Sequence, residues 1–309
     1  YKGRTVLVTG HTGFKGSWLA YWLNRMGAEV YGIALNPPTQ PNHYQLMKPK
    51  VKSYIQDIKA FEAINKIIIE IHPDIIFHLA AQPLVRLSYG EPLNTLSTNI
   101  LGTANILEAA RKLKNLKAVV IVTSDKCYEN KEWVWGYREN EAMGGKDPYS
   151  ASKGCAEIVT SAFRHSFFNH ANSSLIASAR AGNVIGGGDW AKDRIFTDII
   201  ESAAQGKKVF LRFPTATRPW QFVLEPLSGY LTLGWHLLNG DNSLTEGWNF
   251  GPDSSSNFSV KDLVIEASKH WSKIDFDYDN SDHPYEAGFL MLDSSKAHKL
   301  LGWKPVWSF

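Results

Sequence analysis

The stretch TVLVTGHTGFKGS, from Thr5 to Ser17, decides the fold. Its first residues favour a strand, and Gly10, Gly13 and Gly16 follow at intervals of three before a helix expected at 17–26. Glycines at this spacing let the backbone turn tightly and approach a pyrophosphate, while the N–H groups at the start of the helix face the phosphates. An ordinary turn also collects glycine, but at a strand-to-helix junction that opens a βαβ unit the pattern predicts dinucleotide binding.

Short apolar segments and amphipathic segments of helical length alternate through the first half of the chain. After the strand at 5–9 we expect strands at 29–35, 75–79 and 118–123, and helices at 61–71 and 94–113. Strands rich in β-branched residues and separated by helices are typical of a parallel sheet covered on both faces. The sequence therefore predicts an α/β protein with a Rossmann-type doubly wound parallel sheet.

The composition changes after residue 182, where glycine- and proline-rich loops surround short elements and aromatic residues alternate with arginines. We expect a smaller mixed α/β domain there. The predicted division is a dinucleotide-binding domain at 1–182 plus 218–250 and the smaller domain at 183–217 plus 251–309. Within the first of these, 221–238 is expected to return to the main sheet as a strand and a helix.

The overall composition excludes several classes of protein. The chain has 309 residues, 44% of them hydrophobic and 20% charged, with a net charge of +3. These values argue against disorder and against a general affinity for nucleic acid or membranes, and no apolar run approaches the length of a membrane span. The two cysteines, Cys127 and Cys155, exclude a disulfide scaffold, so we expect both to be packing residues in a cytoplasmic protein.

Tyr149 and Lys153 stand one helical turn apart, on the same face of an expected helix. A free phenol ionises near pH ~10, and a neighbouring lysine ammonium favours the phenolate. A surface pair is the alternative, but the phosphate-binding turn upstream favours a catalytic tyrosine that removes a hydroxyl proton.

Ser124, Asp125 and Lys126 follow the strand at 118–123, at the carboxyl edge where α/β sheets bind ligands. A solvated turn is the alternative interpretation of this triplet. An acid beside a base is what elimination of water requires, since one group protonates the departing hydroxyl and the other removes a carbon-bound proton. For that role the pKa of Asp125 must be raised and that of Lys126 lowered.

Several motifs together resemble one known family. They are TGHTGFKGS at 9–17, TSDKCY at 123–128, RAGNVIGGGDW at 180–190, RPWQFV at 218–223 and LLGWKP at 300–305. The chain resembles the extended short-chain dehydrogenases/reductases that act on nucleotide sugars, and within them the CDP-glucose branch of the 4,6-dehydratases. Lys126 fits that branch, because the dTDP-glucose and GDP-mannose branches carry a glutamate there, and it leaves the identity of the C5 base open. Pro219 and Glu225 replace the aspartates frequent in relatives.

The resemblance implies a lyase that makes a 4-keto-6-deoxy sugar of the kind used in bacterial surface polysaccharide. It implies that Tyr149, with Lys153 and Ser124, deprotonates the 4-hydroxyl while hydride passes from C4 to NAD. It then implies that Lys126 removes the C5 proton as Asp125 protonates the departing 6-hydroxyl. In the last implied step, hydride returns to C6. It also implies CDP-glucose as substrate and no metal. The helices at 94–113 and 149–169 are expected to form the four-helix bundle of a homodimer or homotetramer.

The same resemblance implies two sets of binding residues. The cofactor set is Gly10, Thr12, Gly13, Phe14, Lys15, Gly16, Asn36, Asp57, Ile58, Leu79, Ala80, Ala81, Asn99 and Thr123, with Tyr149 and Lys153. The substrate set is Gln82, Ser124, Asn183, Arg194, Arg218, Tyr285 and Glu286, with the arginines on the pyrophosphate. Asn36 stands where NAD enzymes usually carry an acid, so NAD against NADP is decided by the resemblance and not by this position.

Three alternatives remain open at this stage. A C5-inverting UDP-N-acetylhexosamine dehydratase also uses an Asp-Lys pair, a 4-epimerase needs neither Asp125 nor Lys126, and a cofactor-sensing binding protein needs no catalytic tyrosine. Trp133, Trp135 and Tyr137 lie in an inserted loop that either forms a lid or covers the core.

Overall fold

The computed structural model describes residues 1–253 and 256–309. Within these residues a seven-stranded sheet has the order β3-β2-β1-β4-β5-β6-β11, and every neighbouring pair is parallel. Its strands are β1 (Thr5–Thr9), β2 (Glu29–Ala34), β3 (Val51–Ile55), β4 (Ile75–His78), β5 (Ala118–Val122), β6 (Leu175–Ala181) and β11 (Gly247–Phe250). The order reverses between β1 and β4, which confirms the predicted doubly wound sheet and places its ligand crevice at that switch point.

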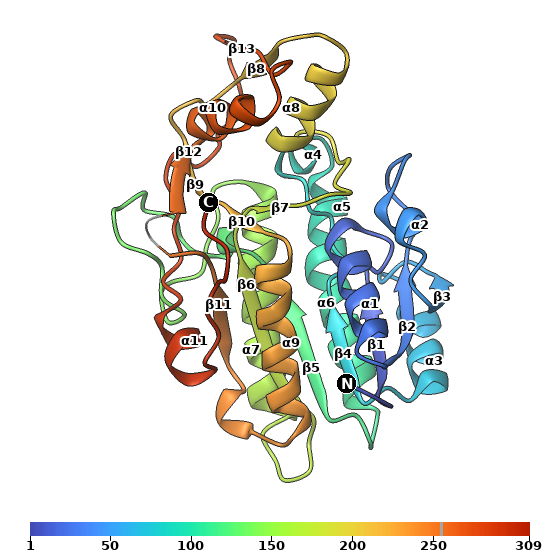
Figure 1. Ribbon diagram of the computed structural model, residues 1–309. Helices are drawn as coiled ribbons and strands as arrows, with labels where there is room; N and C mark the ends of the chain where they lie inside the picture. Colours follow the sequence, from blue (N-terminus) through green and yellow to red (C-terminus); the bar gives the residue numbers. More distant parts are fainter. Residues whose placement is uncertain (254–255) are drawn as a thin grey trace.

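Helices cover both faces of the sheet because the strand residues alternate in direction. On one face, Val6 and Val8 pack under α1 (Phe14–Arg25) and α9 (Leu224–Leu238), which lie in front of the sheet in Figure 1. On the other face, Leu7 packs under α3 (Phe61–Ile71), α6 (Gly102–Arg111) and α7 (Pro148–Phe167). None of the helices among the described residues is both long and apolar enough to span a membrane.

The predicted elements of the first half are confirmed with shifted ends. The helix expected at 17–26 begins earlier, at Phe14, and the helix expected at 94–113 is divided into α5 (Pro92–Leu96), a π-helical turn at Ser97–Leu101 and α6. Two shorter helices, α2 (His43–Met47) and α4 (Val85–Gly90), follow β2 and β4.

One prediction about the second half is wrong. The strand expected after residue 221 does not join the main sheet: β10 (Gln221–Phe222) pairs with β7 (Val184–Ile185) instead, and only α9 returns to the sheet. The last strand of the sheet is β11, whose sequence Gly-Trp-Asn-Phe lacks both β-branched residues and clear alternation.

A smaller lobe stands above the carboxyl edge of the sheet (Figure 1). It contains α8 (Ile195–Ala204), β8 (Val209–Leu211), β9 (Thr217–Pro219), β12 (Asn257–Ser259), α10 (Val260–His270) and β13 (Phe276–Tyr278). Its core gathers Ile199, Leu211, Trp220 and Val264, separately from the two clusters around the sheet. The lobe therefore has its own apolar core. The exact boundaries of the two predicted domains stay a prediction.

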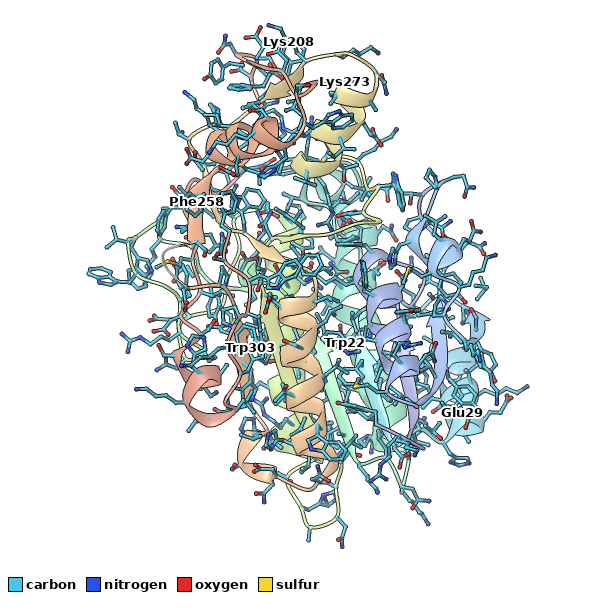
Figure 2. The ribbon with its side chains drawn as sticks, in the orientation of Figure 1. Trp22, Glu29, Lys208, Phe258, Lys273 and Trp303 are labelled. Atoms are coloured by element: carbon cyan, nitrogen blue, oxygen red, sulfur yellow. The ribbon has the colours of Figure 1, made fainter. Side chains whose placement is uncertain are left out.

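The end of the chain returns to the large sheet through α11 (Ser295–Leu300). Trp303 packs edge-on against Phe250 of β11 and donates its indole N–H to Ser228 of α9 at 2.8 Å. Trp22 of α1 packs on the same cluster, and Figure 2 shows both tryptophans near α9. This packing fixes α9, and with it the segment that leads from the lobe to the sheet.

Candidate active site

A cavity of about 900 Å³ opens between the carboxyl edge of the sheet and the lobe. The ends of β1, β2, β4 and β5, the start of α7 and the inner side of the lobe all line it. The structure brings almost all of the predicted site residues together in this lining. Two of them, Asn99 and Tyr285, lie outside the part of the lining that the described residues form.

The glycine turn forms the floor at the β1 end. Gly10 has a φ of +76°, and a Cβ atom there would lie 2.8 Å from the backbone nitrogen of Ala80. Gly13 is the N-cap of α1, and no side chain caps the helix. The free amides at the start of this helix therefore face the cavity, as a phosphate-binding turn requires.

Asn99, predicted in the cofactor set, lies outside the lining that the described residues form. Its side chain is 2% exposed and lies beneath the floor, where it accepts from the backbone N–H of Gln82 at 2.8 Å and donates to Ser152 of α7 at 2.8 Å. Asn99 fixes the turn after β4 against α7 rather than reaching the cavity. Tyr285 points elsewhere too: it is exposed, and its hydroxyl donates to Glu132 at 2.7 Å.

Tyr149 and Lys153 enter the cavity from α7, whose start is fixed by its own sequence. Pro148 begins the helix, and the Asp147 carboxylate caps it by accepting from the Ser150 amide at 2.9 Å. The Lys153 ammonium lies 6.0 Å from the centre of the Tyr149 ring. The phenol and the ammonium are thus held side by side, as the spacing predicts.

Burial sets the charge state of this pair. It raises the pKa of Tyr149 to about 12, against the hydrogen bond with Ser124, and it lowers the pKa of Lys153 to about 8, against the nearby Glu157 carboxylate. Tyr149 is therefore a neutral phenol in the free protein at neutral pH. A further positive charge beside the ring would favour the phenolate.

Asp125 and Lys126 follow β5 in a short 3-10 turn that Ser124 caps. Asp125 is 2% exposed; its Oδ1 accepts from the Ser124 hydroxyl at 2.8 Å, and no described residue donates to its Oδ2. Burial raises the pKa of Asp125, while burial and the charge of Arg218 lower the pKa of Lys126. The two shifts have the directions that a general acid and a general base need.

A buried network behind these residues was missed by the sequence analysis. Glu157, one turn after Lys153, accepts from Arg180 at 2.8 Å and from Ser178 at 2.6 Å, and it also accepts from the Thr123 hydroxyl. Arg180 continues to the Tyr128 hydroxyl at 2.7 Å. The carboxylate thereby joins α7, the end of β5 and β6. No motif points to it, because Glu157 and Arg180 come together only in the fold.

The lobe supplies the cationic side of the cavity. Arg218 is buried, donates to the Thr217 carbonyl at 2.8 Å and lies 3.9 Å from the Glu286 carboxylate. Arg194 lies 3.3 Å from Asp189, and Asn183 lines the wall beside them. The carboxylates balance the arginines in the free protein, and their guanidinium groups suit phosphate oxygens.

Two of the open points from the sequence are answered by packing. Glu225 takes no part in the lining described, because its carboxylate accepts from the backbone of Val306 at 2.9 Å and of Trp307 at 3.0 Å. In the inserted loop, Tyr137 is buried between the rings of Tyr128 and Trp133, at centroid distances of 5.2 and 5.4 Å. Tyr137 and Trp133 thus cover the core, whereas Trp135 is 66% exposed. Cys127 is buried in the same cluster.

Comparison with known proteins assigns the family. The family model described as GDP-mannose 4,6 dehydratase matches residues 7–309. A CDP-glucose 4,6-dehydratase of Salmonella typhimurium is 52% identical over 99% of this chain and 88% of the relative. The chain belongs to the nucleotide-sugar 4,6-dehydratase family. A GDP-mannose 4,6-dehydratase of Vibrio cholerae is 24% identical over 98% of this chain and 90% of that one.

Solved structures of similar proteins share the fold. A dTDP-glucose 4,6-dehydratase from Bacillus anthracis has a TM-score of 0.83 and 19% identity, covering 99% of this chain and 94% of that one. A UDP-glucuronic acid 4-epimerase from Bacillus cereus has a TM-score of 0.85 and 24% identity, covering 98% and 95%. The short-chain dehydrogenase/reductase fold predicted for this dehydratase is therefore confirmed, as is the prediction of a lyase of the dehydratase class.

Proposed function

We propose that this dehydratase converts CDP-glucose to CDP-4-keto-6-deoxyglucose, with NAD as a recycled cofactor. The observation that carries the proposal is the Asp125–Lys126 pair, held beside Tyr149 with pKa shifts in opposite directions. The identity of 52% to a CDP-glucose 4,6-dehydratase supports the nucleotide. A substrate of this kind is made inside the cell, which supports a cytoplasmic enzyme that serves surface polysaccharide synthesis.

The residues at the β1 end of the cavity fit a dinucleotide. The uncapped start of α1 and the space kept by Gly10 suit a pyrophosphate, and the Asp57 and Asn36 side chains line the end expected to take the adenosine. When bound, NAD would supply a hydride acceptor at C4 and a hydride donor at C6, and the positive charge of its ring would favour the Tyr149 phenolate.

The protein's own groups would carry the proton transfers. The Tyr149 oxygen takes the proton of the 4-hydroxyl, aided by Ser124 and the Lys153 ammonium. Once C4 is a ketone, Lys126, whose pKa is lowered by burial and by Arg218, would remove the proton from C5, and Asp125, whose pKa is raised by burial, would give a proton to the 6-hydroxyl. The C5–H and C6–O bonds break, a C5–C6 double bond forms, and water leaves. When the hydride is returned to C6, the proton held by Lys126 would go back to C5, which gives the 4-keto-6-deoxy sugar.

The lobe would bind the nucleotide half of the substrate. We assign the diphosphate to Arg194, Arg218 and Asn183, and the sugar to Gln82, Ser124 and Glu286. The proposed division stays 1–182 plus 218–250 for the dinucleotide and 183–217 plus 251–309 for the nucleotide sugar. Two segments cross it, because β9 with Arg218 pairs with β12 of the lobe and α11 packs against β11 of the sheet.

We also propose a homodimer or homotetramer built on the helices α5, α6 and α7. Leu93 on α5 is 80% exposed, Ile158 on α7 is 58% exposed, and Leu101 in the π-helical turn is exposed as well. Apolar side chains in one region of two neighbouring helices favour burial against a second copy.

The test is mass spectrometry of CDP-glucose incubated with the protein and catalytic NAD, with dTDP-, GDP- and UDP-sugars in parallel. Loss of one water from CDP-glucose, without accumulation of NADH, is the expected result. Water loss only from a UDP-N-acetyl sugar would move the function to the C5-inverting dehydratases. Epimerisation without water loss would contradict the roles given to Asp125 and Lys126.

A further inference from the structure

The cavity continues past Arg194 and Arg218 into the lobe. A nucleotide sugar is a linear molecule, so with the sugar at Tyr149 and the diphosphate at Arg194 and Arg218, the base must lie beyond them. That outer part of the cavity is lined by residues of α8 and of the segment from β8 to β9, and Figure 1 shows where these elements lie in the lobe. Its lining includes Asp198, Ile200, Phe210, Arg212 and Phe213.

Asp198 is the unusual member of this group. It lies on α8 one turn after Arg194, is half-buried, and lines the cavity. No described residue forms a hydrogen bond or an ion pair with its carboxylate. Burial raises the pKa of Asp198 to about 6, opposed by Arg212 and Arg86 and reinforced by Asp193 and Glu201. A ligand that donates a hydrogen bond to such a half-buried carboxylate therefore binds with more favourable free energy.

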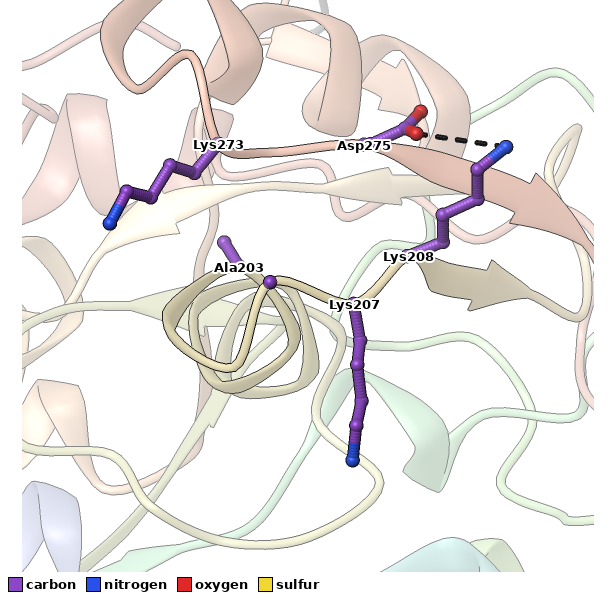
Figure 3. Close-up of a pocket in the computed structure, with 6 residues that line it drawn as sticks. Ala203, Lys207, Lys208, Lys273 and Asp275 are labelled. Carbon is purple, nitrogen blue, oxygen red and sulfur yellow. Dashed lines mark ion pairs between the residues drawn. The ribbon is translucent and has the colours of Figure 1, made fainter.

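The neighbouring arginines do not satisfy Asp198, because Asp193 holds them. The Asp193 Oδ1 lies 3.0 Å from Arg86 and 3.5 Å from Arg212. By contrast, Asp275, another carboxylate of the lobe, is paired with a cation. It lies 3.6 Å from Lys208, beside a second cavity of about 300 Å³ (Figure 3). Asp198 therefore presents an acceptor to the cavity, with the Arg212 guanidinium as the nearby donor.

This arrangement matches the edge of one pyrimidine. Cytosine carries an amino group at C4, next to the acceptors N3 and O2, whereas uracil and thymine carry a carbonyl oxygen at C4, and carboxylates accept from the cytosine amino group. The aromatic rings of Phe210 and Phe213 and the side chain of Ile200 offer apolar surface for the base.

We propose that Asp198 accepts a hydrogen bond from the 4-amino group of the substrate's cytosine, with Arg212 facing N3 or O2, and so makes the site prefer cytidine nucleotides. The inference rests on the proposed function, since it assumes that the cavity takes a CDP-sugar. A uracil or thymine base in the same place would set its C4 carbonyl against the carboxylate, and that repulsion excludes it.

The test measures binding of CDP, UDP, dTDP and GDP by calorimetry to the wild type, to Asp198→Asn and to a control, Asp275→Asn. The wild type and Asp275→Asn are expected to bind CDP about tenfold or more tightly than UDP, the size of effect that a contact to one base provides. In Asp198→Asn the preference falls to about threefold or less, because an asparagine amide can donate to a C4 carbonyl as well as accept from an amino group.

Two results would overturn the inference, and they separate it from the proposed function. A preference for CDP that survives in Asp198→Asn, in protein whose thermal unfolding matches the wild type, removes the role of Asp198 and leaves the proposed substrate intact. Tighter binding of UDP, dTDP or GDP than of CDP by the wild type removes both. If Asp198→Asn does not fold, the same comparison with Asp198→Ser decides, and an unchanged preference there overturns the inference.

Discussion

Replacing Glu157 with glutamine tests whether the buried network holds the proposed catalytic residues in place. Glu157 and Arg180 are 4% and 5% exposed, and their closest charged atoms are 2.8 Å apart. Although burial opposes it, Arg180 lowers the pKa of Glu157, so the carboxylate is ionised. Glutamine keeps the shape of the side chain and removes the charge, which leaves the Arg180 guanidinium buried without a counter-charge.

The expected cost follows from that geometry. Breaking a buried ion pair by removing one partner costs about 3–5 kcal/mol, and we take about 3 kcal/mol because glutamine can still accept one hydrogen bond from Arg180. With an unfolding entropy near 2.1 cal/mol/K per residue, that loss lowers the Tm of a chain of this length by about 5 °C. Thermal unfolding by circular dichroism measures it.

The activity should fall further than the stability. Glu157 accepts from Thr123, which precedes Ser124, and lies one turn after Lys153, so its loss disturbs both partners of Tyr149. We expect kcat to fall about tenfold or more at a temperature where the variant is fully folded, with little change in CDP binding. A Tm within roughly 1 °C of the wild type would exclude a loss of this size and refute the reasoning. An unchanged kcat would refute it as well.

Three further predictions follow from other parts of the structure. His11 and His78 are buried with pKa values lowered by burial to about 4 and about 3, so only the unfolded chain takes up their protons below pH ~6.5. The free energy of unfolding therefore decreases as pH falls, by about 2 kcal/mol for each histidine at pH 5. Urea unfolding at pH 7 and pH 5 measures this decrease, and equal free energies of unfolding at the two pH values would contradict the burial of neutral rings. Asp125→Asn should slow water loss about 100-fold or more while CDP still binds, as product mass and calorimetry would show, and a rate within about tenfold of the wild type would exclude a general acid there. If the proposed homo-oligomer forms through α7, Ile158→Arg should reduce its mass in light scattering to that of a monomer, and an unchanged oligomeric mass would place the interface elsewhere.

The part of the fold that local sequence dictates was predictable. The strand, glycine turn and helix at the N-terminus depend on neighbouring residues, and the central strands are almost entirely apolar, as expected for strands buried on both faces. The strand β11 could not be identified in this way, because a four-residue segment that contains Gly247 and Asn249 owes its conformation to pairing with β6.

The candidate site also contains residues whose positions follow from local sequence and residues whose positions depend on the whole fold. The positions of Tyr149 and Lys153 in the cavity could be predicted because the helix itself sets their spacing, and those of Asp125 and Lys126 because they follow the end of a strand. The hydrogen bonds of Asn99 to Gln82 and Ser152 could not be predicted, because they depend on the packing of separate elements. The arrangement of Asp198 within the lobe is likewise a property of the fold, so no local pattern could reveal it.

The most direct test of the central claim follows one hydrogen atom. CDP-glucose carrying deuterium at C4 is incubated with the protein and catalytic NAD, and the product is analysed by mass spectrometry and NMR. An internal oxidation, dehydration and reduction predicts a product lighter by one water that retains the deuterium, now at C6, with no net change in NADH. Loss of the deuterium from the product, or its return to C4 with no loss of water, would contradict the account.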